Sequence, residues 1–494
     1  LIYARSQNNN HLLVEAVALY TVGLLFPEFR SSPQWHKLGK QWLLEALNRQ
    51  VLPDGGYVQH STNYQRLAIQ AGLWASRIAA VNDEPLPQGS IDALHRMSVC
   101  LGSLVNPETG KVPNFGPNDG AHILPITTCP FEDFRPVIQA AGRAFSGRRT
   151  YPPGPWDEGC VWLGLEVEGV TNGHRLGATS GVDVEIKSPL TPAHSPKGRG
   201  GIYLKPKDHF QHAGLYLMGG HQAWGMLRCA RFASRPGHSD QLHFDLWWGG
   251  RNIVCDPGTY LYNGAPPWDN SLTGAHVHNT VVIDDQEPMT KAGRFLWLDW
   301  SCGELLGHWR SQDNELEVIC AKHDGYRRLD VVHRRTVVRA RDDIWVVIDD
   351  ICGTGFHTAR TGWLLPDSEW RIKGDELLLT PSRVRLTMRT LGAEGPVGLY
   401  RAGVLIEGEP VSGEETLWGW RSLTYATKEP ALRMVRESVG NLPLRLETWW
   451  SLNDADHLSL DLERRDPCLG LSGVSKLEYK GSRLDIDDAH TVDS

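Results

Sequence analysis

Two polar clusters near the start of the chain combine residue types that can move protons. The first runs from Asn8 to His11 (NNNH), and the second runs from Ser61 to Tyr64 (STNY). An imidazole accepts or donates a proton near neutral pH, a phenol donates one, and an amide N–H₂ stabilises developing negative charge. Both clusters also lie where helices are expected to begin, and Asn or Ser side chains cap the free N–H groups there. The spacing alone leaves capping and catalysis both open.

Three later segments hold histidine and aspartate beside turn residues. They are GHSD from Gly237, DPGTY from Asp256 and HVHN from His276. Two imidazoles and a carboxylate from neighbouring strand ends are a ligand set that zinc accepts, with water in the fourth place. Because Gly, Asp, Ser and Pro are also ordinary turn residues, a turn interpretation stays open. The combination is more than turn chemistry requires, and the pattern alone leaves a metal site and ordinary turns both open.

Helices are expected to position the first two clusters. Apolar residues recur at three-and-four spacing from His11 to Phe26, and Ser32 followed by Pro33 looks like the N-cap and first-turn proline of a second helix. Further helices are expected over residues 62–80, 90–104 and 134–145, with a break at 53–56. Helices of this length with short connections pack as antiparallel neighbours, which predicts an α/α bundle or toroid.

Strands are expected to position the metal-site segments. From Gly201 onward, β-branched and aromatic residues alternate with polar ones, as at 242–247, 279–283 and 331–338, and the apolar run at 344–348 suits a strand buried on both faces. Many short strands separated by turns predict packed antiparallel sheets. The predicted fold class is α+β multidomain. Residues 1–150 would form an N-terminal, partial α/α toroid, 151–200 a linker with the first β elements, and 201–494 a large antiparallel β-sandwich.

Composition narrows the class of protein. The chain of 494 residues has 41% hydrophobic residues and a net charge of −8, which indicates a globular protein without a positive field for nucleic acid. No apolar run approaches about 18 residues, so no membrane span is expected. Nine scattered cysteines argue against a disulfide framework and a cysteine zinc site. Nineteen tryptophans mildly favour a carbohydrate partner, although most single indoles fill cores.

In their order along the chain, these segments resemble the heparinase II/III-like family of polysaccharide lyases and alginate lyases of the same architecture. The matching residues are Asn10 and His11, Tyr64, His238 to Asp240, the DPGTY run, HNTVV from His278 and HRR from His333. The resemblance is strongest from about Arg235 to Asp285 and implies an α/α toroid followed by an antiparallel β-sandwich, with the active site in the cleft between them. Because the chain opens on Leu1 in a helical pattern, we expect a fragment that lacks the toroid's earlier helices.

The resemblance implies β-elimination of a uronic-acid-containing polysaccharide. C5 of a uronate lies beside a carboxylate, so hydrogen-bond donors must neutralise that carboxylate as C5 loses its proton. The resemblance makes Asn10 such a donor, His11 a proton acceptor or carboxylate neutraliser, and Tyr64 the base, the acid or both in turn. As a base, Tyr64 needs a cationic or donor-rich setting that lowers its pKa. Arg66 is near in sequence, but on a helix it points away from Tyr64.

By the same resemblance, His238, Asp256 and His278 hold a zinc ion. Its expected role is structural, because elimination requires no metal-activated water. It would tie neighbouring strand ends together near the cleft, with Asp240 orienting one imidazole. The polar loop over residues 113–120 would connect helices at the surface or line the sugar groove. Tyr260 and Tyr262 would line the cleft or pack on strands.

One departure from the family concerns the cleft. Many members carry His-Gly-His where this chain has Pro236 in place of the first histidine, so that helper is lost or is replaced by Arg235 or His243. The departure keeps open a non-catalytic carbohydrate-binding or polysaccharide-assembly protein of the same architecture. A glycoside hydrolase needs two flanking carboxylates, and Glu15 and Asp54 make no convincing pair. The resemblance further implies a bacterial, periplasmic or extracellular protein whose substrate is an acidic polysaccharide or oligosaccharide.

Overall fold

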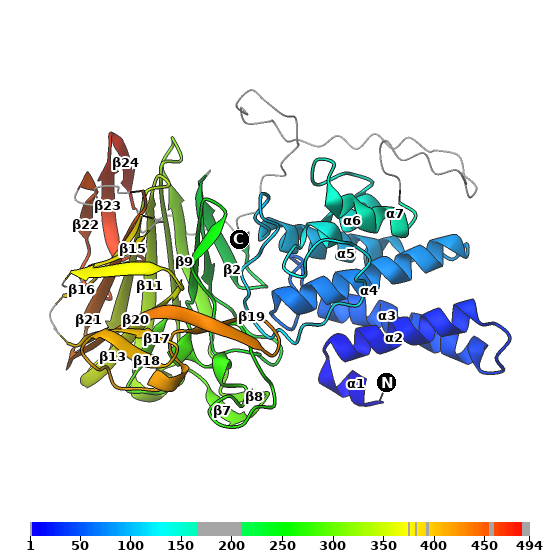
Figure 1. Ribbon diagram of the computed structural model, residues 1–494, viewed down its shortest axis with the longest axis horizontal. Helices are drawn as coiled ribbons and strands as arrows, with labels where there is room; N and C mark the ends of the chain where they lie inside the picture. Colours follow the sequence, from blue (N-terminus) through cyan, green and yellow to red (C-terminus); the bar gives the residue numbers. More distant parts are fainter. Residues whose placement is uncertain are drawn as a thin grey trace.

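The computed structural model describes residues 2–165, 209–220, 222–373, 376–380, 383–391, 395–453 and 459–486. The helices gather at one end of the molecule and the sheets at the other (Figure 1). The strand pairs of all the sheets run antiparallel in the described residues. The predicted α+β class, with a helical N-terminal part and a large antiparallel β part, is confirmed.

The helical part consists of antiparallel hairpins around one apolar core. Its helices are α1 (Ile2–Gln7), α2 (Asn10–Leu25), α3 (Ser32–Gln50), α4 (Thr62–Val81), α5 (Gln88–Ser103), α6 (Arg135–Ser146) and α7 (Glu158–Trp162). Leu12, Leu43, Leu67 and Leu94 are fully or almost fully buried where α2, α3, α4 and α5 meet. Four of the expected helices match α2, α4, α5 and α6 to within two residues. None of the described helices is both long and apolar enough to cross a bilayer.

The expected cap of α3 is displaced by one residue. Ser31 takes the N-cap position and makes no side-chain capping bond, while Ser32 and Pro33 lie in the first turn. The Ser32 hydroxyl instead donates to the Phe26 carbonyl at 2.5 Å. The prediction that Ser32 is the N-cap is therefore wrong, because its hydroxyl satisfies the end of the preceding helix.

Three sheets form most of the β part. The first comprises β1 (His209–Phe210), β2 (Leu215–Gly219), β3 (Ala223–Arg228), β4 (Phe244–Trp248) and β5 (Arg251–Val254), in that order. The second has the order β14 (Glu369–Lys373), β15 (Glu376–Thr380), β16 (Val384–Leu391), β21 (Leu444–Ser451), β12 (Ile344–Cys352), β11 (Val332–Ala340), β10 (Leu316–His323) and β9 (Gly303–Arg310). The third has the order β18 (Val404–Gly408), β17 (Val397–Arg401), β20 (Thr427–Asn441), β13 (Phe356–Pro366) and β6 (Val281–Ile283), with β19 (Trp420–Thr424) paired to β20.

Two small sheets and two apolar cores complete the β part. The small sheets are β22 (Asp461–Arg464), β23 (Val474–Tyr479) and β24 (Ser482–Asp485), and the hairpin β7 (Thr290–Gly293) with β8 (Leu296–Leu298). One core joins the three large sheets and contains Trp345, Trp363 and Trp450, and another lies between β10–β12 and β22–β24. The side chains of β12 are buried from Ile344 to Ile351, which confirms the strand expected to be buried on both faces. Fully buried tryptophans show that many indoles serve packing here.

One disulfide joins the end of β12 to the segment after β22. It links Cys352 and Cys468, whose Cα atoms are 5.6 Å apart, and the other seven cysteines are free. The cysteine count correctly excluded a disulfide framework but did not predict this single bond.

A continuous seam joins the helical part to the first sheet. Phe115 and Leu104 pack with Phe210, Leu215 and Met226 in one apolar cluster. Residues 155–162 are still helical, and residues 166–208, which hold most of the expected linker, lie outside the described residues. The exact domain boundary therefore stays a prediction, while the seam itself fixes how the two halves meet.

Candidate active site

A cavity of about 620 Å³ opens on the seam and brings the first two polar clusters together. Asn10 and His11 line it from the start of α2, and Tyr64 lines it from the start of α4. The sheet half contributes Arg235 and Tyr262 to the same cavity. Residues from distant parts of the sequence thus meet at one solvent-accessible space, as the cleft prediction requires.

The start of α2 resolves the alternative between capping and a cleft position. Asn9 is the N-cap, and its side-chain oxygen accepts from the His11 backbone N–H at 3.1 Å. The Asn10 backbone N–H donates to the Gln59 side chain at 2.7 Å. Because Asn9 does the capping, the side chains of Asn10 and His11 are available to the cavity.

The Tyr64 hydroxyl lies in an acidic, largely buried setting. Ser61 caps α4 by accepting from the Tyr64 N–H, which fixes the tyrosine in the first turn. The hydroxyl donates to Asp119 Oδ2 at 2.8 Å and is 3.1 Å from the Tyr262 hydroxyl. Burial raises the pKa of Tyr64 far above its usual value, and the neighbouring Tyr262 and Asp119 raise it further. The setting is thus the opposite of the cationic one that a tyrosinate base needs.

Arg66 does not relieve this setting. Its guanidinium donates to Asn63 Oδ1 at 2.7 Å and to the Phe131 carbonyl, and it stacks over the rings of Phe131 and Phe134. The expectation that Arg66 points away from Tyr64 is confirmed.

The loop over residues 113–120 lines the cavity and is fastened to both halves. Asn118 donates its backbone N–H to Thr259 Oγ1 at 2.8 Å, and Asn114 donates its side-chain N–H to the Ser422 carbonyl at 2.8 Å. Asp119 Oδ1 accepts from the Ala121 N–H at 3.0 Å, which leaves Oδ2 for Tyr64. The sequence left a surface connection and a groove-lining position both open for this loop, and it gave Asp119 no partner, because no local pattern links it to Tyr64.

The structure separates the two residues that could replace the missing helper histidine. Pro236 and Arg235 line the cavity. His243 is almost fully buried, and its Nδ1 accepts from the Asn279 backbone N–H at 3.1 Å. His243 therefore belongs to the interior beside the metal-site segments and does not replace the missing helper. Arg235 is the candidate that the structure places in the cleft.

His238, Asp256 and His278 converge in the interior, outside the lining of this cavity, as predicted for a metal site. Their potential ligand atoms all lie within 4.8 Å of one another, and all three residues are buried. His278 Nε2 is 3.7 Å from Asp256 Oδ2. Both nitrogens of His238, Oδ2 of Asp256 and Nε2 of His278 have no hydrogen-bond partner. Buried polar atoms without partners are costly, and a bound cation would satisfy them. The residues present therefore fit a metal ion.

The protonation states of the histidines also suit a metal. Burial and the neighbouring His278 lower the pKa of His238 to about 3. Burial and the neighbouring His243 lower the pKa of His278 to about 4. Both imidazoles are therefore neutral near pH 7, which is the form that donates a lone pair to a metal.

The surrounding residues orient the triad. The Nδ1–H of His278 donates to the Gly274 carbonyl at 2.7 Å, which directs Nε2 toward Asp256. The buried Arg433 donates to the carbonyl of His278 at 3.0 Å. Asp240 pairs with Arg228 at 3.3 Å, so the imidazole contact expected of Asp240 is replaced by an arginine contact.

The HRR run from His333 belongs to a buried network of hydrogen bonds and ion pairs. Arg335 donates to the Asn279 and Leu242 carbonyls at 2.6 Å each and pairs with Asp349 at 2.7 Å. His333 contacts the same carboxylate at 2.7 Å. This buried cluster connects β11 to Leu242, just after the GHSD segment, and to Asn279 of the HVHN segment, and it lies outside the cavity lining.

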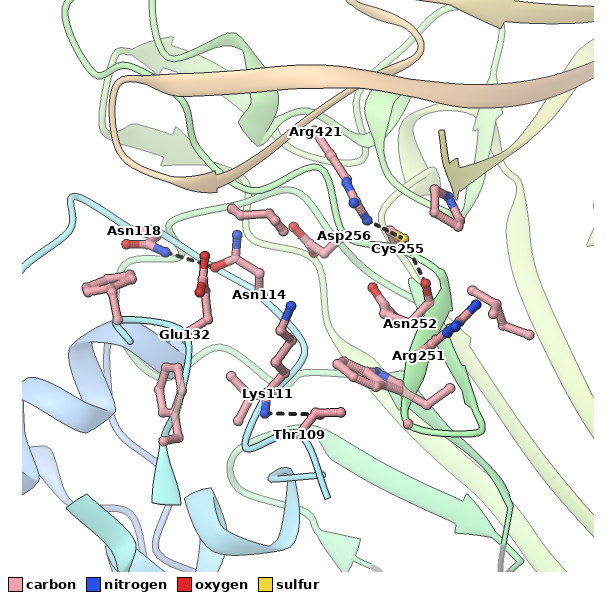
Figure 2. Close-up of a pocket in the computed structure, with 18 of the residues that line it drawn as sticks. Thr109, Lys111, Asn114, Asn118, Glu132, Arg251, Asn252, Cys255, Asp256 and Arg421 are labelled. Carbon is pink, nitrogen blue, oxygen red and sulfur yellow. Dashed lines mark hydrogen bonds between the residues drawn. The ribbon is translucent and has the colours of Figure 1, made fainter. Parts of the chain in front are cut away.

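A second cavity of about 370 Å³ lies elsewhere on the seam (Figure 2). Lys111 and Glu132 face it from the helical half, and Arg251 and Asn252 face it from the sheet half (Figure 2). Its described lining contains none of the predicted catalytic residues, although Asp256 borders it. We therefore assign the active-site candidate to the first cavity.

Comparison with known proteins identifies the family. The model for the heparinase II/III N-terminus matches residues 2–123, and the model for the heparinase II/III-like C-terminal region matches residues 203–437. The chain belongs to the heparinase II/III-like family. The two matched regions lie in the helical half and in the β half of this chain, respectively.

Curated relatives of this family member are heparin-sulfate lyases. One from Bacteroides stercoris is 22% identical over 409 residues, covering 80% of this chain and 51% of the relative. One from Pedobacter heparinus is 25% identical over 372 residues, covering 73% of this chain and 47% of the relative. The chain thus spans about half the length of the curated relatives it matches.

Solved structures show the same fold. A heparinase III structure has a TM-score of 0.67 at 18% identity, covering 97% of this chain and 65% of that chain. The heparan sulfate lyase HepC from Pedobacter heparinus has a TM-score of 0.62 at 18% identity, covering 97% of this chain and 66% of that chain. These similarities agree with an N-terminal helical part followed by a large antiparallel β part.

Proposed function

We propose that this protein is a polysaccharide lyase that cleaves a uronic-acid-containing polysaccharide by β-elimination. The observation that carries the proposal is the seam cavity, which gathers Asn10, His11 and Tyr64 from separate helices. Relatives that are named heparin-sulfate lyases support an acidic polysaccharide as the substrate.

The cavity residues have complementary roles in this reaction. The Asn10 amide donates to the uronate carboxylate, whose negative charge otherwise opposes loss of the C5 proton. Arg235, the one arginine or lysine among the described lining residues, adds a positive charge on the sheet side. His11 lies beside Asn10 and either neutralises the uronate carboxylate or accepts the C5 proton. Tyr64 presents a hydroxyl that can exchange a proton with the sugar ring.

The metal held by the triad is proposed to be zinc with a structural role. Two neutral imidazoles and one carboxylate suit zinc better than calcium or magnesium, which prefer oxygen ligands. His238 follows Pro236 in the chain by two residues, so fixing its position also fixes the sheet-side wall of the cavity. The ion would neutralise Asp256 and satisfy the two imidazole nitrogens.

We also propose a bacterial protein that works in the periplasm or outside the cell. The disulfide between Cys352 and Cys468 supports an oxidising compartment, because such bonds rarely persist in a reducing cytosol. Polymeric substrates are also found outside the cytoplasm.

To test the lyase proposal, the full chain is incubated with each of a panel of polyuronates, and ultraviolet absorbance in the unsaturated-uronate band is recorded. The wild-type protein should produce the signal, and Tyr64→Phe should abolish it. Tyr260→Phe is the matched control, because it removes a tyrosine hydroxyl near the seam from a residue that does not line the cavity. If the folded, metal-loaded wild type gives no signal on any polymer, the lyase proposal is rejected in favour of a carbohydrate-binding or polysaccharide-assembly role.

A further inference from the structure

The hydroxyl of Tyr64 has two partners whose directions define where its single proton lies. Asp119 Oδ2, at 2.8 Å, can only accept from it while Asp119 is ionised. The Tyr262 hydroxyl, at 3.1 Å, must then donate to Tyr64 Oη. One lone pair of Oη is thus used by Tyr262, and the other is left for the cavity that Tyr64 lines. Tyr64 Oη therefore faces the substrate with a free lone pair, so it can accept a proton or a hydrogen bond from the substrate.

The same surroundings disfavour a tyrosinate. Burial raises the pKa of Tyr64, and so do Tyr262 and Asp119. Arg66 is engaged with Asn63 and Phe131, and Arg235 has no described contact with the Tyr64 hydroxyl. Tyr64 therefore enters the reaction as a neutral phenol, and a neutral phenol takes up a proton only if it passes its own proton on.

We propose that Asp119 acts through Tyr64 as a positioning residue that takes the tyrosine hydroxyl proton and later returns it. This inference rests on the proposed lyase function. The C5–H bond breaks, its proton goes to Tyr64 Oη, and the original hydroxyl proton goes to Asp119 Oδ2. The C5–H electron pair forms the C4–C5 double bond, and the C4–O4 bond breaks with its electrons on the leaving oxygen.

Return of the proton completes the cycle. Tyr64 donates its proton to the leaving oxygen while Asp119 gives its proton back to Tyr64, so both residues end as they began. The balance needs no water, metal or co-reactant. Because one hydroxyl both accepts and returns the proton, the C5 hydrogen and the leaving oxygen must lie on the same face of the sugar ring. Glucuronate and mannuronate units have this arrangement, whereas their C5 epimers do not.

The backbone holds Asp119 in a position suited to this role. Its Oδ1 accepts from the Ala121 N–H at 3.0 Å and is 3.5 Å from the Asn63 side-chain nitrogen. The neighbouring Asn118 N–H is fastened to Thr259 of the sheet half. The carboxylate is therefore fixed by one oxygen, and the other oxygen is free to exchange a proton with Tyr64.

The decisive variant is Asp119→Asn in the full chain. Its side-chain oxygen can keep the contact with Ala121, and its N–H₂ group would then donate to Tyr64, which reverses the hydrogen bond. Tyr64 would retain a proton to donate but lose the group that takes it. On a glucuronate- or mannuronate-containing polymer, kcat should fall about 100-fold or more while KM changes less than about 3-fold, as expected for a lost acid–base function.

Two further variants make the result specific. Glu132→Gln is the matched control, because it removes a carboxylate from the same interhelical connection at a residue outside the active-site cavity, and its kcat should match wild type. Asp119→Ala should lose kcat similarly and regain at least about tenfold in the presence of formate, a small carboxylate that can fill the vacated space. A purely structural role for Asp119 would give no formate rescue.

The outcomes separate this inference from the lyase proposal. Reduced kcat in Asp119→Asn together with formate rescue of Asp119→Ala supports the proton-holding role. An active wild type with unchanged kcat in folded Asp119→Asn overturns the role and leaves the lyase proposal intact, as does Asp119→Ala that formate does not rescue. A wild type that is inactive on every polymer rejects the lyase proposal itself.

Discussion

Removal of the metal from the His238, Asp256 and His278 triad should lower the stability of the β part measurably. Without a cation, the three atoms that would bind it, one nitrogen from each of His238 and His278 and one oxygen of Asp256, are left in the interior without partners. Treatment with a chelator at neutral pH creates this state without a mutation. It leaves the surrounding hydrogen bonds of Gly274 and Arg433 in place.

The expected magnitude follows from the three ligand atoms. A buried polar atom without a partner costs about 1–3 kcal/mol, and water that enters the stripped site reduces this toward the lower end. Three such atoms give about 3 kcal/mol, which is also about the stabilisation from a ligand at roughly 100 times its Kd. A domain of about 150–250 residues would show a fall in Tm of about 6–12 °C, and the larger β part is expected at the lower end of that range.

Scanning calorimetry with and without chelator, followed by addition of one metal at a time, measures this effect. The His278→Gln variant should melt early and respond little to chelator. The His276→Gln variant is the matched control, because His276 contacts Glu287 and Glu414 and does not belong to the triad. A wild type with less than about 0.1 metal ion per chain and a Tm that chelator shifts by less than about 2 °C would refute the reasoning.

Three further predictions concern other residues. Arg235→Ala should raise KM for an acidic polymer about 10-fold, through loss of about 1.5 kcal/mol of charge-assisted binding, whereas Lys111→Ala in the second cavity should not. Burial opposes ionisation of Asp349, but Arg335 and His333 together outweigh it and hold its pKa at about 2. Asp349→Asn should therefore lower the free energy of unfolding by about 3–5 kcal/mol at neutral pH. Because this pKa lies below its unfolded value, the part of that stability that depends on ionisation, about 2–3 kcal/mol, is present above about pH 4 and lost as pH falls toward 2. Urea unfolding at pH 5 and at pH 2.5 should therefore show a smaller pH dependence in the variant. Cys468→Ser should lose about 4–5 kcal/mol, because the disulfide spans 116 residues, and reductant should affect only the wild type.

Elements with a local signal were predictable from the sequence. The spacing of apolar residues places four helices to within two residues, and the continuous apolar run identifies the buried strand β12. The metal triad was also predictable, because each ligand lies beside turn residues in a segment with a family pattern. Caps were less predictable, since three consecutive asparagines give the same signal and only the folded chain shows that Asn9 is the one that caps.

Contacts made across the seam could not be predicted in the same way. Asp119 is 55 residues from Tyr64, and Tyr262 is 198 residues from it, so no periodicity connects the three. The sequence also could not show that His243 turns into the interior while Arg235 faces the cavity. Those directions depend on how two separately patterned halves pack against each other.

The hydrogen bonds across the seam restrict how this architecture can be recombined. Tyr64 and Tyr262 come from different halves, as do Asn118 and Thr259. A chimera that joins the helical half of one member to the β half of another would inherit intact domains and a mismatched boundary. Natural variation at these positions should therefore be correlated between the halves, and directed evolution of either half alone should meet a limit on activity that paired libraries at the boundary remove.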